Sequence, residues 1–436
     1  MKQLNVGILG LGTVGGGTYT VLHRNADEMA RRTGVNIKVT HVADRDLERA
    51  NALTQGNVNI TDDAFALVEN PDIDVVVELI GGYTIAKDLV LKAIANKKHV
   101  VTANKALIAL HGNEIFSAAQ KMGVMVAYEA AVAGGIPIIK ALREGLGANR
   151  IEWIAGIING TTNFILTEML EKGLAYEEVI GEAQRLGYAE ADPTFDVEGI
   201  DAAHKLVIMS AIAFGMPLKF DEVYTEGITQ LAQADIKYAE ELGYTVKLLG
   251  ITKRTDKGVE LRVHPTLIPE KCLVANVDGA MNAVLVQGDA VGPTLYYGAG
   301  AGAEPTASAV IADLIDIARL KDATETQRAP ALGYQADQVQ DLNVLPIEEI
   351  TSAYYLRMHA TDKPGVIAAV THILGDKSIS IDAMIQKEHA AGTAVADIVF
   401  LTHSTVEKNM NAAIAEIESL PAVEGNLVKL RMETLG

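Results

Sequence analysis

Residues 4–15 read LNVGILGLGTVG, a short apolar strand that runs into three spaced glycines. In a turn from a parallel strand to a helix, the first glycine permits the sharp bend and the second lets a pyrophosphate approach the backbone. The third glycine packs the helix against the strand, and the helix N-terminus favours the phosphate charge. A tight turn without a ligand is the alternative. The stretch predicts a doubly wound α/β fold whose turn contacts a dinucleotide through Gly10, Gly12, Thr13, Val14 and Gly15.

Apolar strands and helices continue to alternate after this turn. The first helix is expected at 14–32, and further strands are expected at 36–44, 74–80, 99–105 and 124–130. Strands that alternate with helices indicate parallel βαβ units. The apolar runs lack strict alternation, as expected when helices cover both faces of the sheet. We therefore assign residues 1–130 to an NAD(P)-binding domain of the Rossmann type.

The residues after the second predicted strand bear on the choice between NAD and NADP. Asp44 can accept hydrogen bonds from a ribose 2′-hydroxyl, which favours NAD, and Arg45 can meet a 2′-phosphate, which favours NADP. Asp44 lies further from the glycines than the usual about 20 residues, so a longer first helix is expected. An exposed ion pair is the alternative for Arg45, and the sequence leaves the preference open.

From about residue 131 the pattern changes. A Gly-Gly-Ile-Pro turn at 134–137 leads into a helix, and later strands are separated by turns rather than by crossover helices, at 244–251, 259–264 and 283–287. This order predicts an α+β region with a mixed or antiparallel sheet, residues 131–302. We expect this region to serve catalysis, substrate binding and dimerisation. The helix at 303–320 is expected to return to the first domain.

The last part of the chain follows a polar segment, residues 321–349, which lacks clear periodicity and is taken as a linker. Residues 350–436 then read as strand, helix, strand, strand, helix and strand. The expected ranges are 352–360, 365–375, 379–387, 393–402, 405–420 and 425–432. This βαββαβ order predicts a ferredoxin-like module.

The composition limits the classes of function. A chain of 436 residues is expected to form roughly three domains. The formal charge of −19, with no local basic cluster, argues against a nucleic-acid binder. The chain shows no charged leader, and no apolar run reaches about 18 residues, so a cytoplasmic protein without a membrane partner is expected. The single cysteine, Cys272, excludes an internal disulfide and a cysteine-rich metal site.

Residues 184–205, QRLGYAEADPTFDVEGIDAAHK, form an acidic stretch punctuated by glycine and proline. Its carboxylates are Glu190, Asp192, Asp196, Glu198 and Asp201. Acids followed by one lysine, Lys205, suit a site that holds an ammonium group and moves a proton beside it. Of these acids we expect Glu190 and Asp201 to face the substrate and the other three to shape and solvate the loop.

Two lysines are candidates for the proton transfer. Asp201 and Lys205 lie four residues apart on one face of a helix, and a desolvated lysine beside a carboxylate can exchange a proton. A surface ion pair worth about 0.3–0.5 kcal/mol is the alternative. Lys105 ends the strand HVVTANK and is expected at the carboxyl edge of the sheet, where doubly wound folds bind ligands. The alternative for Lys105 is a solvated lysine at the end of a strand, without a role in the reaction.

The run from Ala183 to Lys205 resembles the signature of the homoserine dehydrogenase family, with every signature position filled. The matching positions are Ala183, Gly187, Tyr188, Ala189, Asp192, Pro193, Asp196, Val197, Gly199, Asp201 and Lys205. The N-terminal glycines, the strand end 102–105 and the turn 159–163 also resemble this family, so the resemblance covers about residues 1–320. It implies NAD(P)-dependent interconversion of L-homoserine and L-aspartate 4-semialdehyde.

The resemblance implies a role for several residues. Lys205 matches the catalytic lysine, Glu190 and Asp201 match the substrate-binding acids, and Lys105 matches the lysine near cofactor and substrate. Which lysine transfers the proton stays open. Gly187 and Gly302 are further candidates for cofactor contact; for Gly302, close approach to the backbone competes with flexible linkage. Cys272 has no histidine placed to activate it, which argues against a dehydrogenase that forms a thioester.

The resemblance also implies a monovalent cation, usually sodium, near the domain junction. Its ligands correspond to the side chain of Glu129 and the carbonyls of Val132, Gly134 and Ile136. One carboxylate and several carbonyls suit a hard cation. A local salt bridge at Glu129, with the turn acting only as a hinge, is the alternative.

Residues 350–436 resemble an ACT domain. The turn from Asp362 to Gly365 follows the first strand of the module, where such domains often bind an amino acid, and the next helix N-terminus offers donors to a carboxylate. The implied ligand is L-threonine, a feedback inhibitor in threonine, methionine and isoleucine biosynthesis. A role in dimerisation alone is the alternative. A homodimer or homotetramer is expected.

Two other functions stay open at this point. One is another amino-acid or aldehyde dehydrogenase of the same build, and the other is a nucleotide- and amino-acid-sensing regulator without catalysis. The presence of Glu190, Asp201, Lys105 and Lys205 argues against the regulator. The chain lacks an aspartokinase region and is expected to be monofunctional.

Overall fold

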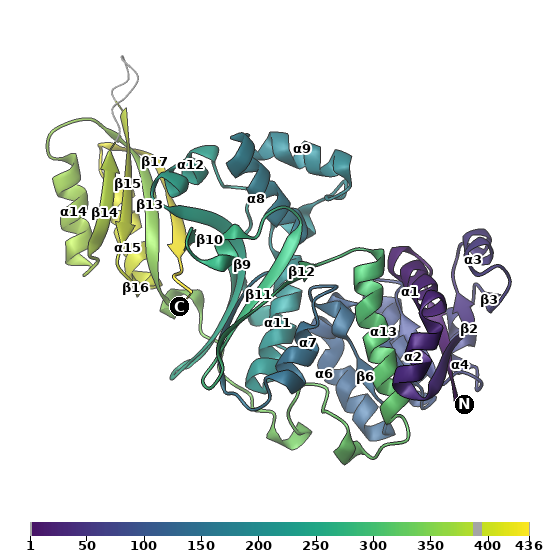
Figure 1. Cartoon of the computed structure of the whole chain (residues 1–436). Coiled ribbons are helices and arrows are strands. Elements are labelled where there is room, and N and C mark those ends of the chain that lie inside the picture. Colours follow the sequence, from purple (N-terminus) through teal and green to yellow (C-terminus); the bar gives the residue numbers. More distant parts are fainter. Residues whose placement is uncertain (1, 387–394, 436) are drawn as a thin grey trace.

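The computed structural model describes residues 2–386 and 395–435. Figure 1 shows three parts in a row: one around β1, one around β9 and α11, and one around β13. Within the described residues, no helix combines the length and the apolar character that a membrane crossing needs.

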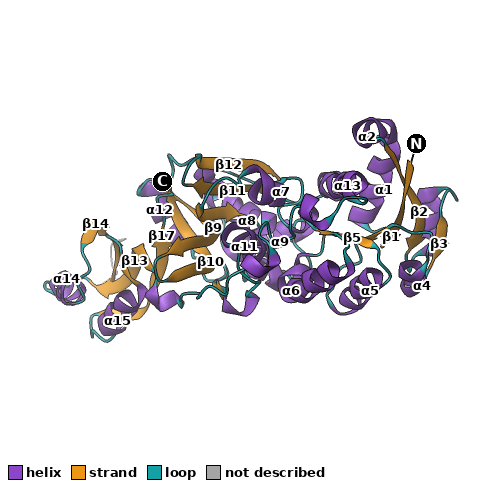
Figure 2. Cartoon of the chain, turned by 90° about the horizontal axis from the view of Figure 1, so that it is seen from below, coloured by secondary structure: helices purple, strands orange, loops and turns teal. Residues whose placement is uncertain are grey.

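The N-terminal part is a six-stranded parallel sheet in the order β3-β2-β1-β4-β5-β6. Its strands are β1 (Lys2–Leu9), β2 (Val35–Ala43), β3 (Asn59–Thr61), β4 (Val75–Glu78), β5 (His99–Thr102) and β6 (Val126–Ala127). Its helices are α1 (Thr13–Arg24), α2 (Ala26–Thr33), α3 (Leu47–Thr54), α4 (Ala64–Glu69), α5 (Thr84–Ala95) and α6 (Lys105–Met122). Helices cover both faces of the sheet (Figure 2), and a separate apolar cluster lies between the sheet and the helices on each face. This is the strand order of dinucleotide-binding sheets, so the predicted Rossmann fold is confirmed.

Three local predictions in this part are wrong. The helix expected at 14–32 is two helices, because Asn25 leaves the helical conformation (φ −109°, ψ 20°). The strand expected at 99–105 ends at Thr102, since the Asn104 side chain accepts a hydrogen bond from Leu107 N at 3.0 Å and caps α6. Lys105 is therefore the first residue of a helix rather than the end of a strand. The strand expected at 124–130 shrinks to β6, and a 3-10 turn (Glu129–Ala131) follows it.

Helix α13 (Ala303–Leu320) comes late in the chain and packs beside α1 (Figure 1). Its buried residues Ala307, Val310 and Leu314 belong to the same apolar cluster as β1 and β2. The two helices approach closely, because a Cβ added to Gly17 would lie 2.5 Å from the Ala303 carbonyl oxygen. The final helix of the core therefore covers one face of the N-terminal sheet.

The middle part combines helices with long antiparallel strands. Its helices are α7 (Ile138–Lys140), α8 (Gly160–Lys172), α9 (Tyr176–Leu186), α10 (Thr194–Val197), α11 (Ile200–Phe214) and α12 (Gln233–Glu241). Its strands are β7 (Ile151–Ile157), β8 (Tyr224–Thr225), β9 (Tyr244–Thr255), β10 (Gly258–Pro269), β11 (Met281–Gly288) and β12 (Gly292–Ala299). Apolar residues of α8, α11 and α12 form one core with this sheet. The predicted mixed sheet is confirmed.

The C-terminal part has the predicted βαββαβ order. Its elements are β13 (Thr351–Thr361), α14 (Val366–Asp376), β14 (Ile381–Gln386), β15 (Val395–Thr402), β16 (Thr405–Val406), α15 (Glu407–Glu418) and β17 (Val423–Met432). The expected strand 379–387 ends, and the expected strand 393–402 begins, in residues that lie outside the described chain.

One continuous sheet joins the middle and C-terminal parts. Its strand order is β12-β11-β7-β9-β10-β17-β13-β15-β14. The junction is the parallel pair β10–β17, in which Thr266 pairs with Arg431 and Leu267 pairs with Met432. The segment 321–349 is also packed, since Leu332, Val344 and Leu345 are buried. The C-terminal module is thus fixed to the middle part by backbone pairing as well as by side chains.

Candidate functional site

A cavity of about 390 Å³ opens at the carboxyl end of the N-terminal sheet. It is lined by Val14, Glu78, Leu79, Gly81, Gly82, Tyr83, Ala103, Asn104, Lys105, Ala106 and Phe195. All of these except Phe195 belong to the N-terminal part, while Phe195 comes from the acidic loop of the middle part. The cavity therefore lies between the predicted cofactor turn and the predicted catalytic loop.

The three glycines of the N-terminal turn meet three different environments. Gly10 has a positive φ of +88°, and a Cβ there would lie 2.9 Å from the Leu79 carbonyl oxygen. A Cβ on Gly15 would lie 1.9 Å from the Gly10 carbonyl oxygen, so only glycine lets α1 pack this closely. A Cβ on Gly12 would meet nothing within 4 Å. The backbone at Gly12 and the N-terminus of α1 therefore face open space that a pyrophosphate can fill.

Replacing Gly15 by alanine is expected to distort the turn, at a cost of about 1–3 kcal/mol in the free energy of unfolding. The variant should melt at a lower temperature and lose affinity for the nicotinamide cofactor. Gly12→Ala is the matched control: it should keep the wild-type melting temperature and lose only cofactor affinity. Thermal melting and a fluorescence titration with NADPH measure both quantities. A Gly15→Ala protein with wild-type values would contradict this account.

Asp44 lies beneath the same turn. Its carboxylate accepts hydrogen bonds from Leu11 N at 2.5 Å and from Asp46 N at 2.8 Å, and Arg49 lies 3.3 Å away. Burial would raise the pKa of Asp44, but these bonds lower it, so the group is ionised at neutral pH. Arg45 is exposed. The ionised carboxylate stands where an adenosine ribose meets the second strand in such folds, with Arg45 next to it.

Asp201 is the centre of a buried cluster. Lys205 Nζ donates to Asp201 Oδ2 at 2.6 Å and to the Ile158 carbonyl at 2.6 Å. Lys105 Nζ lies 2.9 Å from Asp201 Oδ1. The side chain of Asp201 is 4% exposed and that of Lys205 is 10% exposed, unlike a surface ion pair. One carboxylate therefore holds two lysines from different parts of the fold, α6 and α11.

Asn159 completes this cluster, although no role was predicted for it from the sequence. Its side chain accepts a hydrogen bond from Thr162 N at 2.8 Å and so caps α8. Its Nδ2 donates to Asp201 Oδ2 at 2.8 Å and to Asp196 Oδ1 at 2.7 Å. Asparagine at a helix start is a recognisable capping signal, but the two distant acids are not visible in it. Asp196 thus belongs to the cluster and does more than solvate the loop.

Burial and charge make the two lysines different. Burial lowers the pKa of Lys205, and the charge of Asp201 opposes this only in part. Burial alone would lower the pKa of Lys105 as well. The nearby carboxylates of Asp201, Asp196 and Glu190 nevertheless raise this pKa above its ordinary value. Burial alone would raise the pKa of Asp201, yet both lysines hold it well below its usual range. The cluster contains an ionised acid, a firmly charged lysine, and a lysine that gives up its proton more readily.

An aromatic stack lies beside the cluster. The ring centroid of Phe195 is 6.0 Å from Lys105 Nζ and 5.3 Å from the His204 ring. His204 in turn stacks on Phe220 at 4.3 Å, and its ring nitrogens are buried without a hydrogen-bond partner in the described chain. Burial lowers the pKa of His204 to about 4, so the ring is neutral at physiological pH. The stack places the exposed Phe195 at the cavity wall, a role that the sequence analysis did not predict.

A second feature missed in the sequence is a buried acid at the cavity. Glu78 ends β4, lines the cavity and is 0% exposed. It accepts hydrogen bonds from Thr102 Oγ1 at 2.7 Å and Ile80 N at 3.0 Å, and burial raises its pKa. These bonds tie together the ends of β4 and β5, where the cavity opens.

The other predicted site residues are more dispersed. Glu190 is exposed in the acidic loop and is close enough to raise the pKa of Lys105. Gly187 ends α9 with φ +79° and Gly302 precedes α13 with φ +120°; neither lines the cavity. In the C-terminal module, Gly365 precedes α14, and Asp362 accepts a long hydrogen bond from Gln386 at 3.4 Å.

The predicted cation ligands lie in the segment 129–136, between β6 of the N-terminal part and α7 of the middle part. The Glu129 carboxylate accepts hydrogen bonds from Ile139 N at 2.9 Å and Lys140 N at 2.8 Å, and it is buried. A second buried acid, Asp313, accepts from Glu129 N at 2.9 Å. Turn hydrogen bonds within the described residues end on the carbonyl of Ile136 but not on those of Val132 and Gly134. Carboxylates and carbonyls are the kinds of oxygen ligand that a hard cation takes, so the monovalent cation stays a prediction that these residue types allow.

Comparison with known proteins gives the same picture over the whole chain. A family model described as homoserine dehydrogenase matches residues 137–315, one described as homoserine dehydrogenase, NAD binding domain, matches 10–129, and an ACT domain model matches 354–422. Homoserine dehydrogenases of Pseudomonas aeruginosa and Neisseria gonorrhoeae are each 60% identical to the chain, with 100% of both sequences covered.

Solved structures agree with these matches. A homoserine dehydrogenase from Thiobacillus denitrificans superposes with a TM-score of 0.96 at 65% identity and covers 100% of this chain and 99% of its own. A Staphylococcus aureus homoserine dehydrogenase superposes with a TM-score of 0.77 at 30% identity, covering 99% of each chain. A hyperthermophilic archaeal homoserine dehydrogenase in complex with NADPH has a TM-score of 0.63 at 27% identity over 74% of this chain and 99% of its own.

Proposed function

The chain belongs to the homoserine dehydrogenase family, and we propose that it interconverts L-homoserine and L-aspartate 4-semialdehyde at the cluster of Asp201, Lys205 and Lys105. The resemblance seen in the sequence is confirmed, and the protein is an oxidoreductase with a nicotinamide-binding domain. The observation that carries the proposed site is the single buried carboxylate that holds both lysines next to the cavity. The alternatives, a non-catalytic regulator and another dehydrogenase, do not account for the family match.

The nicotinamide cofactor, when bound, accepts or supplies the hydride. Gly10, Gly12, Thr13, Val14 and Gly15 would hold its pyrophosphate, and Asp44 or Arg45 its adenosine ribose. The chain's own residues must then hold the amino acid and move the proton of its hydroxyl group. Gly187 and Gly302 remain candidates for cofactor contact outside the cavity wall.

We assign the proton transfer to Lys205. A general acid or base works best when its pKa approaches the operating pH, and the pKa of Lys205 is lowered by burial. Two of its N–H groups bond to Asp201 and Ile158, which leaves a third for the substrate oxygen. Lys105 lines the cavity and keeps its charge, so it suits stabilisation of the oxygen on which negative charge develops.

Two carboxylates are proposed to serve the substrate. Glu190 is exposed at the loop and can receive the substrate ammonium, while Asp201 faces the substrate together with the lysines that it fixes. The cation proposed at Glu129, Val132, Gly134 and Ile136 would hold the turn between the N-terminal and middle parts. This proposal is supported by the buried Glu129 carboxylate and by the carbonyls of Val132 and Gly134, which accept none of the described turn hydrogen bonds.

A further proposal concerns the regulation of the enzyme through its C-terminal module. L-threonine is proposed to bind the C-terminal module near Asp362 and Gly365, where α14 presents its N-terminus, and to act as a feedback inhibitor of threonine, methionine and isoleucine synthesis.

We also propose a cytoplasmic homodimer or homotetramer. The proposed domains are 1–130 with 303–320, 131–302 and 350–436, with a linker at 321–349. Two apolar clusters, one within the first of these domains and one within the last, support this division.

A spectrophotometric assay tests the function. The purified protein should form reduced nicotinamide from L-homoserine, and comparison of NAD⁺ with NADP⁺ gives the cofactor preference. The same assay in sodium or tetramethylammonium buffer tests the cation, and millimolar L-threonine tests the inhibition. Absence of turnover with both cofactors would overturn the proposed reaction. Turnover that is indifferent to threonine would leave the reaction standing and remove the regulatory role.

A further inference from the structure

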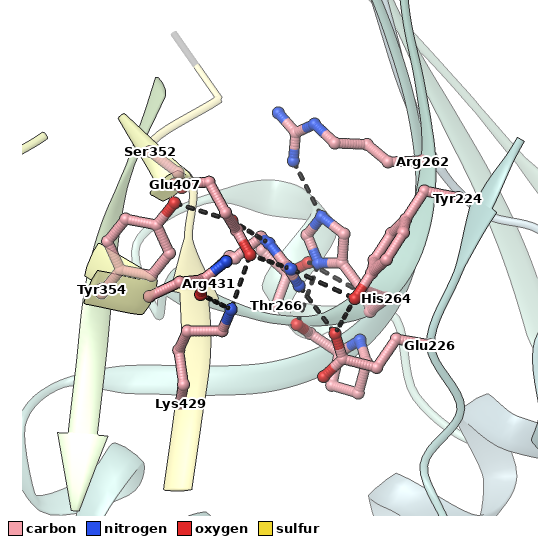
Figure 3. A network of polar contacts seen from close by, with 12 residues as sticks. Tyr224, Glu226, Arg262, His264, Thr266, Ser352, Tyr354, Glu407, Lys429 and Arg431 are labelled. Carbon is pink, nitrogen blue, oxygen red and sulfur yellow. Dashed lines mark hydrogen bonds and ion pairs between the residues drawn. The ribbon is translucent and has the colours of Figure 1, made fainter. Parts of the chain in front are cut away.

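The last strand of the chain inserts a buried arginine between the C-terminal and middle parts (Figure 3). Arg431 on β17 is 1% exposed and binds Glu407 of its own module through Nη2 at 2.6 Å and Nε at 2.9 Å. Lys429 binds the same carboxylate at 2.6 Å. Two cations thus share one buried acid within the module, which leaves one positive charge without a counterion there.

The missing negative charge comes from the middle part. Arg431 Nη1 donates to Glu226 Oε2 at 2.8 Å, and the guanidinium lies 5.0 Å from the ring centroid of Tyr224 (Figure 3). Tyr224 also donates its hydroxyl to Glu226 at 2.9 Å. Glu226 is therefore held in one orientation by two partners, and its backbone is fixed by a hydrogen bond from Glu226 N to the Val263 carbonyl at 2.8 Å.

The residues after Glu226 lie directly against the acidic loop. A Cβ added to Gly227 would lie 2.5 Å from the Val197 carbonyl oxygen and 2.5 Å from Glu198 Oε2. Ile228 N donates to the Val197 carbonyl at 2.9 Å, and Thr229 Oγ1 donates to Glu198 Oε1 at 2.9 Å. The segment 226–229 is therefore bonded directly to residues 197–198 and packs against them without a gap at Gly227.

The acidic loop connects residues 197–198 to the candidate site. Val197 and Glu198 stand between Asp196 and Asp201, and both aspartates are bonded to Asn159. A shift of 197–198 would move the carboxylates relative to the two lysines. Positions of catalytic groups matter at this scale, because a misplacement of about 1 Å can cost about a hundredfold in rate.

We propose that Arg431 and Glu226 are positioning residues through which the C-terminal module holds the acidic loop and Asp201 in place. The module then acts on the reaction through the acidic loop, although none of its described residues lines the cavity. This inference rests on the proposed role of Asp201. A matched contact exists at the same junction: Arg357 on β13 binds Asp235 on α12 at 2.6 and 3.0 Å, and neither residue bonds to 196–201 within the described chain.

The test compares Glu226→Gln with Asp235→Asn, which each neutralise one acid partner of a module arginine. Glu226→Gln should raise the KM for homoserine about tenfold, with little change in the KM for NADPH measured in the reverse reaction. Asp235→Asn should leave the KM for homoserine near wild type, even where it lowers the melting temperature. Because the Glu226 side chain is 33% exposed, its variant is expected to fold. Equal KM values in both variants, or a wild-type KM in Glu226→Gln, would overturn the proposal.

Arg431→Met and Arg357→Met form a second matched pair. The double variant Arg431→Met/Glu226→Gln should have the KM of the worse single variant, because both changes break the same contact. Independent, multiplying effects would contradict the shared contact. Failure of the wild-type protein to oxidise homoserine would instead refute the proposed function, so the two failures are distinguishable.

Discussion

Lys205→Ala is expected to lower kcat by about two to four orders of magnitude, the range that a positioned general acid or base contributes. The chemical reason is that Lys205 has the lowered pKa in the cluster, while Lys105 stays charged. Cofactor affinity should remain near wild type, because Lys205 does not line the cavity at the glycine turn. Single-turnover rates and a fluorescence titration with NADPH measure the two quantities separately.

Lys247→Ala is the matched control for the removal of a buried lysine. Lys247 Nζ donates to the Val277 carbonyl at 2.7 Å and to Asp278 at 3.0 Å, so it has the same kinds of partner as Lys205. Burial lowers the pKa of Lys247 too. This variant should lose stability and keep the turnover of its folded fraction. If Lys205→Ala also retains near-normal turnover, the assignment of the proton to Lys205 is wrong.

The features that the sequence predicts well are local. Gly10, Gly12 and Gly15 each have a role that depends on a few neighbouring residues, and the structure gives each a matching environment. Asp201 and Lys205 are four residues apart on one helix, so their contact follows from helix geometry. Spacing within one element is enough to predict such pairs.

The features that the sequence did not reveal depend on the register of distant segments. Lys105 reaches Asp201 because α6 starts at Lys105, capped by Asn104, and the two parts dock. Asn159 likewise bonds to two acids that follow it by about 40 residues. The pairing of β10 with β17 joins two predicted domains in one sheet. The sequence pattern within either domain alone does not predict this pairing. These contacts are set by tertiary packing rather than by periodicity.

Asp201→Asn is expected to damage both activity and stability. The change leaves two lysines beside a neutral amide, and loss of one partner from a buried ion pair costs about 3–5 kcal/mol. The negative charge of Asp201 raises the pKa of Lys105 and opposes the lowering of the pKa of Lys205. Both lysine pKa values should therefore be lower in the variant than in the wild type. The pH profile of kcat/KM should therefore move to lower pH, with a loss of about a hundredfold or more at neutral pH.

The pH dependence of stability gives an independent check on Asp201. Its pKa in the folded state lies below its ordinary value, so its contribution to stability is complete above about pH 4 and is lost as the pH falls towards the folded-state pKa. The difference in unfolding free energy between the wild type and Asp201→Asn should shrink as the pH falls below about 4.

Asp278→Asn provides the control, since it removes the acid partner of Lys247 at a half-exposed position away from the cavity. It should leave the pH profile of kcat/KM unchanged. Chemical denaturation at a series of pH values and steady-state kinetics measure the two effects of Asp201→Asn. An Asp201→Asn protein with the wild-type pH profile would show that the carboxylate does not set the proton affinity of the lysines. The reactive lysine would then have to obtain its pKa from burial alone.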